Sequence, residues 1–419
     1  MKRFFLLLLY MSLYCGAVYA QGYNHNIGED SLNNYESLTN KLFKIEKKHD
    51  AFNVWLNYAA SFQTTDATDK WETRFANRDI RIEITGNITD RLSYRIRHQL
   101  NKSNAERGED NFAKATDLAW IGYRFNNKWS IQGGKICLNW GGFEYDENPL
   151  FIYRYSDFID ATDIFMAGVG LAFKPIPSQE FVIQGTNTYN GSFSEEWGDN
   201  PVAVGRDITD YTLLKKNRHP LTFIANWNGE FFDNRLQTRW AWGIQTLAKG
   251  KTARLLTLGQ HLNLPTLQWY IDYYGGWYDM DHLRYVNKDF GNWLQLADNE
   301  DSELAILATD DEDGVSPVMT NVRYHSFVTK ANWQFAPRWN IMLKGTLESV
   351  SAPRFHEFKD YRKAYVYAAS LEYYPIKQQN LRIFLAYMGH TIDYSNRCRL
   401  KDKTTNHIEL GFMYRMKCF

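Results

Sequence analysis

The sequence predicts an all-β protein, a transmembrane antiparallel β-barrel of about 16 strands formed by residues 51–419. The first observation is a period of two, as in residues 80–85, where three isoleucines alternate with Arg, Glu and Thr. The second is composition: aromatic residues make up 16% of the chain although the mean hydropathy is -0.50. Membrane barrels combine these properties because only alternate positions are apolar and aromatic side chains gather in two interfacial girdles.

The first 20 residues have the features of a secretory signal peptide. Lys2 and Arg3 form a charged start, residues 4–13 an apolar centre, and residues 18–20 a small-residue cleavage site. We therefore expect an exported protein whose signal peptide spans residues 1–20.

Residues 21–50 are expected to form a helical segment in the periplasm. Tyr35, Leu38, Leu42 and Ile45 follow one another at intervals of three and four residues, which is the spacing of a coiled-coil seam. Two interpretations remain open. The segment is either a short oligomerisation helix, forming a trimeric coiled coil, or a lone amphipathic helix or linker beside the barrel.

Sixteen stretches with period two and β-forming side chains follow one another along the chain. The expected strands are residues 52–62, 76–86, 91–101, 116–125, 129–138, 165–173, 180–187, 220–230, 236–246, 254–264, 267–278, 321–335, 339–349, 364–374, 381–392 and 405–419. Short turns alternate with longer connections at residues 63–75, 102–115, 139–164, 188–219, 247–253, 279–320, 350–363 and 393–404. Short turns at one end and long loops at the other are typical of outer-membrane barrels.

The two faces of a strand differ in polarity in the way that a hydrated barrel requires. Leu343 and Leu347 share one parity, whereas Lys344 and Glu348 share the other. We expect the apolar parity to face lipid and the charged parity to face a lumen. Beyond the signal peptide, no apolar run reaches the roughly 18 residues that a membrane-spanning helix needs.

The connection at residues 139–164 is unusually aromatic for a solvated loop. Its large apolar side chains are Trp140, Phe143, Tyr145, Phe151, Tyr153, Tyr155 and Phe158. Such surface normally packs against other parts of a protein. We therefore expect this third long loop to fold into the barrel and to narrow the pore.

The mature sequence resembles the phosphate-selective porin O and P family of Gram-negative outer membranes. The residues that carry the resemblance are the N-terminal helix and the runs ANRDIRIEITGNITDRLSYRIRHQL and WSIQGGKICLNWGGFEYDENPLFIYRYSDFIDATDIFMAGVGLAF. The resemblance implies a 16-stranded trimeric porin whose third external loop folds into the lumen. It also implies transport of anions along a ladder of arginines. This chain departs from that pattern, because Arg154 is the only basic residue of its third loop, set among six acidic residues.

The candidate selectivity groups are basic residues expected to line the pore: Arg81, Arg95, Arg97, Lys135, Arg154, Arg239, Lys330, Lys344 and Arg382. The candidate constriction residues are Glu144, Asp146, Tyr153, Tyr155 and Asp157. An excess of positive charge in a narrow aqueous passage concentrates anions. The alternative is that these charges neutralise carboxylates on neighbouring strands.

Together these features predict an outer-membrane porin that gives passive diffusion of small hydrophilic solutes, with a preference for anions, such as phosphate or organic anions, if the basic residues face the pore. The alternative is a receptor barrel whose long loops close the mouth. The expected surroundings are outer-membrane lipid, lipopolysaccharide and two further copies of the chain, with no nucleic acid. We expect no enzyme activity, cofactor or metal, because no nucleophile elbow, metal motif or phosphate loop is present. Cys137, Cys398 and Cys418 are expected to be unpaired thiols.

Overall fold

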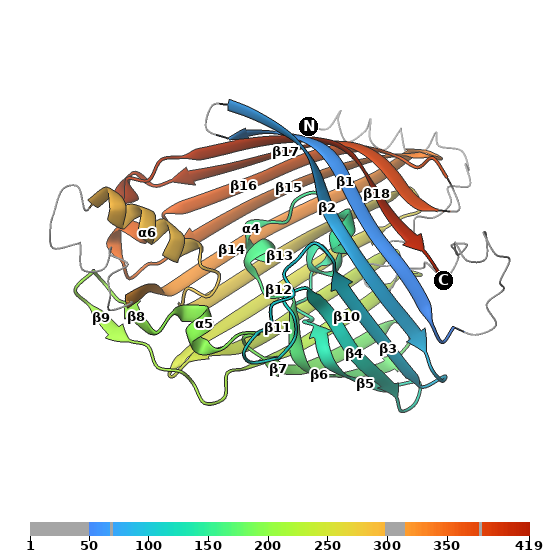
Figure 1. Ribbon diagram of the computed structural model, residues 1–419, viewed down its shortest axis with the longest axis horizontal. Helices are drawn as coiled ribbons and strands as arrows, with labels where there is room; N and C mark the ends of the chain where they lie inside the picture. Colours follow the sequence, from blue (N-terminus) through green and yellow to red (C-terminus); the bar gives the residue numbers. More distant parts are fainter. Residues whose placement is uncertain (1–49, 68–69, 298–314, 377–378) are drawn as a thin grey trace.

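The structure, a computed structural model, describes residues 50–419 except 68–69, 298–314 and 377–378. The predicted signal peptide and N-terminal helix lie outside the described residues and stay predictions. Strands dominate the described part, and they run side by side around a barrel (Figure 1).

A closed ring of antiparallel strands forms the barrel. Of the 18 strands, β8 and β9 lie outside the ring, which leaves 16. The ring closes because β1 pairs with both β18 and β2. Its strands are β1 Asn53–Ala67, β2 Lys70–Asn87, β3 Leu92–Gln99, β4 Thr116–Arg124, β5 Trp129–Cys137, β6 Phe165–Ile176, β7 Gln179–Asn187, β10 Leu221–Phe231, β11 Leu236–Ala248, β12 Lys251–Asn263, β13 Leu267–Met280, β14 Val315–Ala336, β15 Trp339–Ser351, β16 Arg362–Tyr373, β17 Asn380–Tyr394 and β18 Lys403–Lys417. The predicted barrel and its strand number are confirmed.

The long connections at one end of the barrel carry further elements. Strand β8 (Asn200–Val204) pairs in parallel with the start of β14 and antiparallel with β9 (Tyr211–Leu213). The helices of these connections are α5 Phe193–Trp197, α6 Tyr285–Ala297, η3 His356–Phe358 and η4 Asn396–Cys398. In Figure 1, α5, α6, β8 and β9 gather at the left, at the end opposite the C-terminus. None of the described helices is both long and apolar enough to cross a membrane.

Alternation of side chains explains how the strands form the wall. Along β15, Leu343 is 54% exposed and Leu347 is 49% exposed, whereas Lys344 and Glu348 are buried. The apolar parity therefore faces outward and the charged parity faces inward, as the sequence predicts. The barrel thus presents hydrocarbon to its surroundings and encloses polar groups.

Two of the predicted long loops are wrong. Residues 63–75 belong mostly to strands, because β1 continues to Ala67 and β2 begins at Lys70. This segment is polar, but its threonines and aromatic residues are strong strand formers, so its polarity is a poor sign of a loop. Residues 247–253 contain only a tight turn between β11 and β12, where Gly250 adopts a φ of 72°.

Candidate functional site

The connection between β5 and β6 is the third at the end of the barrel that carries the long loops. It lies against the inner face of the barrel. It contains α3 (Phe143–Asp146), η2 (Pro149–Phe151) and α4 (Asp157–Ala161). Helix α3 contacts β12 and β13, α4 contacts β14, and η2 contacts β1 and β18. The connection therefore crosses the interior from one wall to another, and we call residues 138–164 the third loop.

Carboxylates of the wall hold the N-termini of both short α-helices. Asp272 of β13 accepts hydrogen bonds from the first two backbone N–H groups of α3, each at 2.8 Å. Glu348 of β15 does the same for α4, at 2.8 and 2.9 Å. A negative group is favourable there because the unpaired N–H groups and the helix dipole point toward it. Before α3, only glycine fits at Gly142, because an added Cβ would lie 2.2 Å from the Tyr274 hydroxyl.

Buried ion pairs join the loop to the wall. Three loop carboxylates pair with wall cations: Glu144 with Lys344, Glu147 with Lys330 at 2.6 Å, and Asp157 with Arg362 at 2.6 Å. None of these six side chains is more than 6% exposed. Burial alone would raise the pKa of Asp157, but its hydrogen bond with His390 and the charge of Arg362 hold that pKa below its usual range. Removing one partner of such a pair leaves an unpaired buried charge, which is strongly destabilising.

Other predicted residues of the third loop also find partners on the wall. The Tyr153 hydroxyl donates to Glu372 at 2.7 Å, and Arg382 pairs with the same carboxylate at 3.1 Å. Arg154 contacts the ring nitrogen of His390 at 2.9 Å. These contacts occupy the groups that were expected to meet a solute.

Arg78 of β2, which the sequence analysis missed, also reaches the third loop. Its guanidinium donates to the backbone carbonyls of Ile152 and Tyr153, at 2.7 and 3.1 Å. A signal for it exists in the sequence: the outward apolar positions of β2 are odd-numbered up to Phe75 and even-numbered from Ile80. Such a change of parity marks an extra residue in the strand.

On the other side of the barrel, arginines and carboxylates of β2, β3, β4 and β18 form two neighbouring sets of ion pairs, which we together call the arginine cluster. Its ion pairs are Arg81 with Asp79, Arg81 with Asp117 at 2.8 Å, Arg97 with Asp117 at 3.1 Å, Arg95 with Glu83 at 2.5 Å, and Arg415 with Glu83 at 3.0 Å. These ion pairs join four guanidinium groups to three carboxylates.

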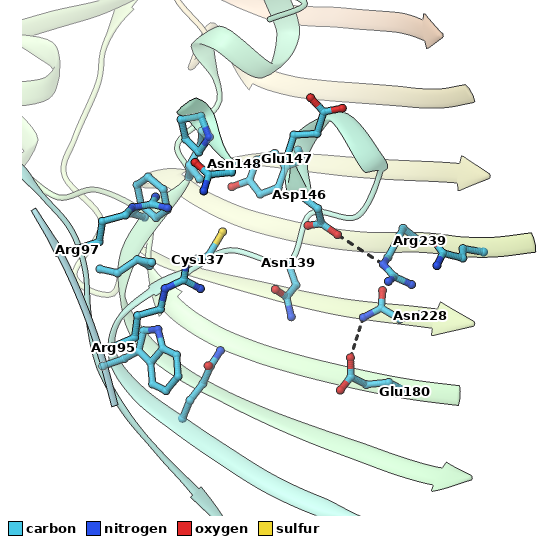
Figure 2. Close-up of a pocket in the computed structure, with 18 of the residues that line it drawn as sticks. Arg95, Arg97, Cys137, Asn139, Asp146, Glu147, Asn148, Glu180, Asn228 and Arg239 are labelled. Carbon is cyan, nitrogen blue, oxygen red and sulfur yellow. Dashed lines mark hydrogen bonds and ion pairs between the residues drawn. The ribbon is translucent and has the colours of Figure 1, made fainter. Parts of the chain in front are cut away.

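A cavity of about 480 Å³ lies between the third loop and the wall formed by β3–β7, β10 and β11. Its cations are Arg95, Arg97, Lys174 and Arg239. Its carboxylates are Asp146, Glu147, Glu180 and Glu230. Figure 2 shows Arg95 and Arg97 on one side and Arg239 on the other, where Arg239 faces Asp146 at 3.6 Å.

The structure brings only some of the predicted site residues to this cavity. Those that line it are Arg95, Arg97, Arg239, Asp146 and Tyr155. Those that do not are Arg81, Lys135, Arg154, Lys330, Lys344, Arg382, Glu144, Tyr153 and Asp157. Lys135 pairs instead with Asp110 at 2.8 Å. Pairing between neighbouring strands, the alternative raised by the sequence, is seen for Arg95 with Glu83, Arg97 with Asp117 and Arg382 with Glu372. Lys330 and Lys344 pair with the third loop instead.

The described residues offer no group of three or more His, Cys, Asp or Glu side chains that could hold a metal ion. Cys137, Cys398 and Cys418 form no disulfide bond with one another in the structure.

Comparison with solved structures finds barrels of the same fold. An outer-membrane channel, DcaP of Acinetobacter baumannii, matches with a TM-score of 0.55 and 11% identity, covering 89% of this chain and 99% of that one. OmpF of Salmonella typhi matches with a TM-score of 0.52 and 13% identity, covering 89% and 99%. An anion-selective porin from Comamonas acidovorans matches with a TM-score of 0.51 and 9% identity, covering 87% and 99%. At these identities the likeness concerns the fold alone.

Comparison at the level of sequence identifies the family. No curated protein matches the chain. The family described as phosphate-selective porin O and P matches residues 52–416, which is nearly the whole barrel. This match agrees with the resemblance seen in the sequence, and it indicates a protein that passes solutes, not one that catalyses a reaction. The chain therefore belongs to the phosphate-selective porin O and P family and is an outer-membrane porin.

Proposed function

We propose that this porin lets small hydrophilic solutes diffuse past the third loop, with a modest preference for anions. The observation that carries the proposal is the arginine cluster, whose four guanidinium groups face three carboxylates beside a cavity of about 480 Å³. Positively charged groups beside a narrow aqueous passage attract anions and repel cations. The family description and the anion-selective porin of similar fold support this choice.

The preference is expected to be modest because the cavity itself is balanced. Four cations and four carboxylates line it, so they contribute no net charge. The third loop adds only one basic residue, Arg154, which contacts His390. We therefore propose that the modest preference extends to small anions in general, without a ladder dedicated to phosphate.

The third loop is proposed to be the constriction that limits solute size. Its residues Asp146, Glu147 and Tyr155 border the cavity, whereas Glu144 and Asp157 attach it to the wall. Size selection then comes from the position of the loop. Charge selection comes from the arginine cluster, of which Arg95 and Arg97 line the cavity.

We further propose that the end with the long connections faces the cell exterior and that residues 21–50 lie in the periplasm and hold a homotrimer together. The support is the coiled-coil spacing of that segment and the alternation of short and long connections. Removing residues 21–48 is then expected to weaken the trimer more than it weakens the barrel. Semi-native gels and heat-modifiable mobility measure the two effects separately, and an unchanged trimer would contradict this role.

The test of the proposed function is single-channel current in a planar bilayer under a salt gradient. Stable conductance steps with a reversal potential on the anion side are expected. Steps with a reversal potential on the cation side would keep the porin and contradict the anion preference. Folded protein that gives no steps would contradict diffusion through the barrel.

One observation favours a second function, that of a receptor with a covered mouth. Aromatic rings from α6 and from the connection between β15 and β16 pack together: Phe290 lies 5.5 Å from Phe355 and 5.9 Å from Phe358, and Trp293 lies 5.6 Å from Phe355. Long connections joined in this way restrict access to the interior. The same bilayer measurement separates the two functions, because a closed receptor does not conduct.

A further inference from the structure

Arg78 occupies a bulge in the hairpin of β1 and β2. Ala59 faces Asp79 and Ala60 faces Asn77, so Arg78 is an extra residue without a partner on β1. A bulge of this kind redirects side chains away from the regular alternation of a strand. Here it directs Arg78 to the interior, where its side chain is 13% exposed.

The guanidinium of Arg78 connects residues 148–153, which we call the tip of the third loop, to the wall. Its Nη2 donates to the carbonyl oxygens of Ile152 and Tyr153, and its Nε lies 3.2 Å from the carboxylate of Glu409 on β18. The planar, forked guanidinium suits several acceptors at fixed directions better than an ammonium group does. The contact with the loop is made to backbone atoms.

Aromatic rings and a buried apolar cluster surround this contact. The guanidinium carbon lies 5.5 Å from the ring centre of Tyr153 and 5.7 Å from that of Phe384. Leu150 and Phe151 of the loop tip are buried in one cluster with Phe384 and with Met413 of β18. Apolar contacts are not directional, so this cluster favours burial of the tip without fixing its position.

The same loop tip borders the cavity. Asn148, Pro149 and Phe151 line it on the side of the third loop. Opposite them, Arg95 and Arg97 line it from β3. A shift of the tip therefore changes the width of the space beside these two arginines.

We propose that Arg78 is a positioning residue that fixes the tip of the third loop and thereby sets the width of the passage. The inference rests on the proposed function, because it requires solutes to pass beside that loop. Arg78 acts through hydrogen bonds to the loop backbone and through its ion pair with Glu409. The hydrogen bonds of its planar guanidinium contribute more to the position of the tip than its positive charge does.

The experiment compares Arg78→Gln with a matched variant, Arg74→Gln. Arg74 lies on the same strand and the same face, and its Nε donates to Gln63 of β1 at 3.3 Å. Both substitutions remove one positive charge, but only Arg78→Gln releases the contact with Ile152 and Tyr153. Heat-modifiable mobility on gels confirms that each barrel is folded. Single-channel conductance and the uptake of sugars of increasing size by liposomes report the width.

We expect Arg78→Gln to raise conductance by about 1.5-fold, with a noisier open state and a larger size limit, since a loosened loop obstructs the passage less. Arg74→Gln should keep the wild-type conductance and size limit. Arg78→Lys should fall between the wild type and Arg78→Gln, because an ammonium group keeps the charge and loses the planar fork.

Equal conductance and size limit in Arg78→Gln and Arg74→Gln would overturn the inference, since Arg78 would then act only as a charge. If Arg78→Gln does not fold, Arg78→Lys decides: a raised conductance supports the positioning role and a wild-type conductance overturns it. A wild-type protein without conductance steps would instead overturn the proposed function, and the inference with it.

Discussion

The third loop has two sides, and the same types of charged residue lie on both. Toward β13–β16, Glu144, Asp157 and Glu147 form ion pairs with side chains that are at most 6% exposed. Toward β3–β7, β10 and β11, a cavity remains, and there Arg95 is 26% exposed and Asp146 is 24% exposed. The first side is an attachment of the loop, and the second is the proposed passage.

The difference shows that burial, more than residue type, decides what a charged pair does. A buried pair is expensive to break, because either partner left alone is a charge without water. A partly exposed pair contributes little to stability, but its charges act on ions in the solution beside it. Lys344 and Arg95 were equivalent candidates in the sequence, and their surroundings separate them.

The largest expected effect comes from removing the loop itself. Deletion of the 12 residues from Asn148 to Ile159 removes the tip and most of α4, including their contacts with the wall. We expect conductance to rise roughly twofold or more, because the proposed obstruction is gone. Single-channel recording of the folded variant measures it, and an unchanged conductance would show that the third loop does not limit the passage.

The next effect is a difference in the free energy of unfolding between variants on the two sides of the third loop. Lys344→Met leaves Glu144 buried without its counter-ion, and we expect it to lower the free energy of unfolding by about 3–5 kcal/mol. Arg95→Gln should lower it less, since Arg95 is partly exposed and its buried partner Glu83 keeps the ion pair with Arg415 at 3.0 Å. Urea unfolding in detergent measures both. A double variant, Lys344→Met with Glu144→Gln, should recover most of the loss, and no recovery would contradict the pairing.

Much of the fold could be predicted from the sequence, because a strand that separates lipid from water must alternate. All sixteen strands of the ring are found where period two occurs, to within a few residues at most ends. The errors fall where that constraint ends. Beyond the lipid, both faces of a strand meet water, so the tips of β1 and β2 look like a loop in the sequence although they are paired.

The site was less predictable, because parity shows which residues face inward and not which of them meet solvent. Lys330 and Lys344 face inward as expected, yet the third loop covers them. That cover depends on contacts between residues far apart in the sequence, such as Glu144 and Lys344, which are 200 positions apart and which no local pattern records. Arg78 was not predicted to face the interior because the bulge at this residue changes the parity of β2. The alternation of the isoleucines after it describes only the regular part of the strand.

A smaller effect tests the charge of the passage. The double variant Arg95→Gln, Arg97→Gln removes two cations that line the cavity. We expect the ratio of anion to cation permeability to fall about twofold, with little change in conductance at high salt, where charges are screened. Reversal potentials at low and high salt measure this. Lys344→Gln is the comparison from the attached side of the loop, because neither Lys344 nor its partner Glu144 lines the cavity. An equal fall in selectivity in that variant would erase the distinction between the two sides.

The smallest expected effect is a dependence of ion selectivity on pH. Burial raises the pKa of Asp146 to about 6, although Arg239 opposes this and Glu180 adds to it. As pH falls through this value, Asp146 becomes neutral, and the cavity changes from four cations and four carboxylates to four cations and three carboxylates. The reversal potential should therefore move toward the anion side between pH 8 and pH 5, and Asp146→Asn should remove most of that movement. The pKa of Asp157, by contrast, lies below its usual range, so its ion pair with Arg362 stays charged over the same interval. If Asp146→Asn shows the same movement as the wild type, the charge that titrates lies elsewhere and the cavity is not the place where ions are selected.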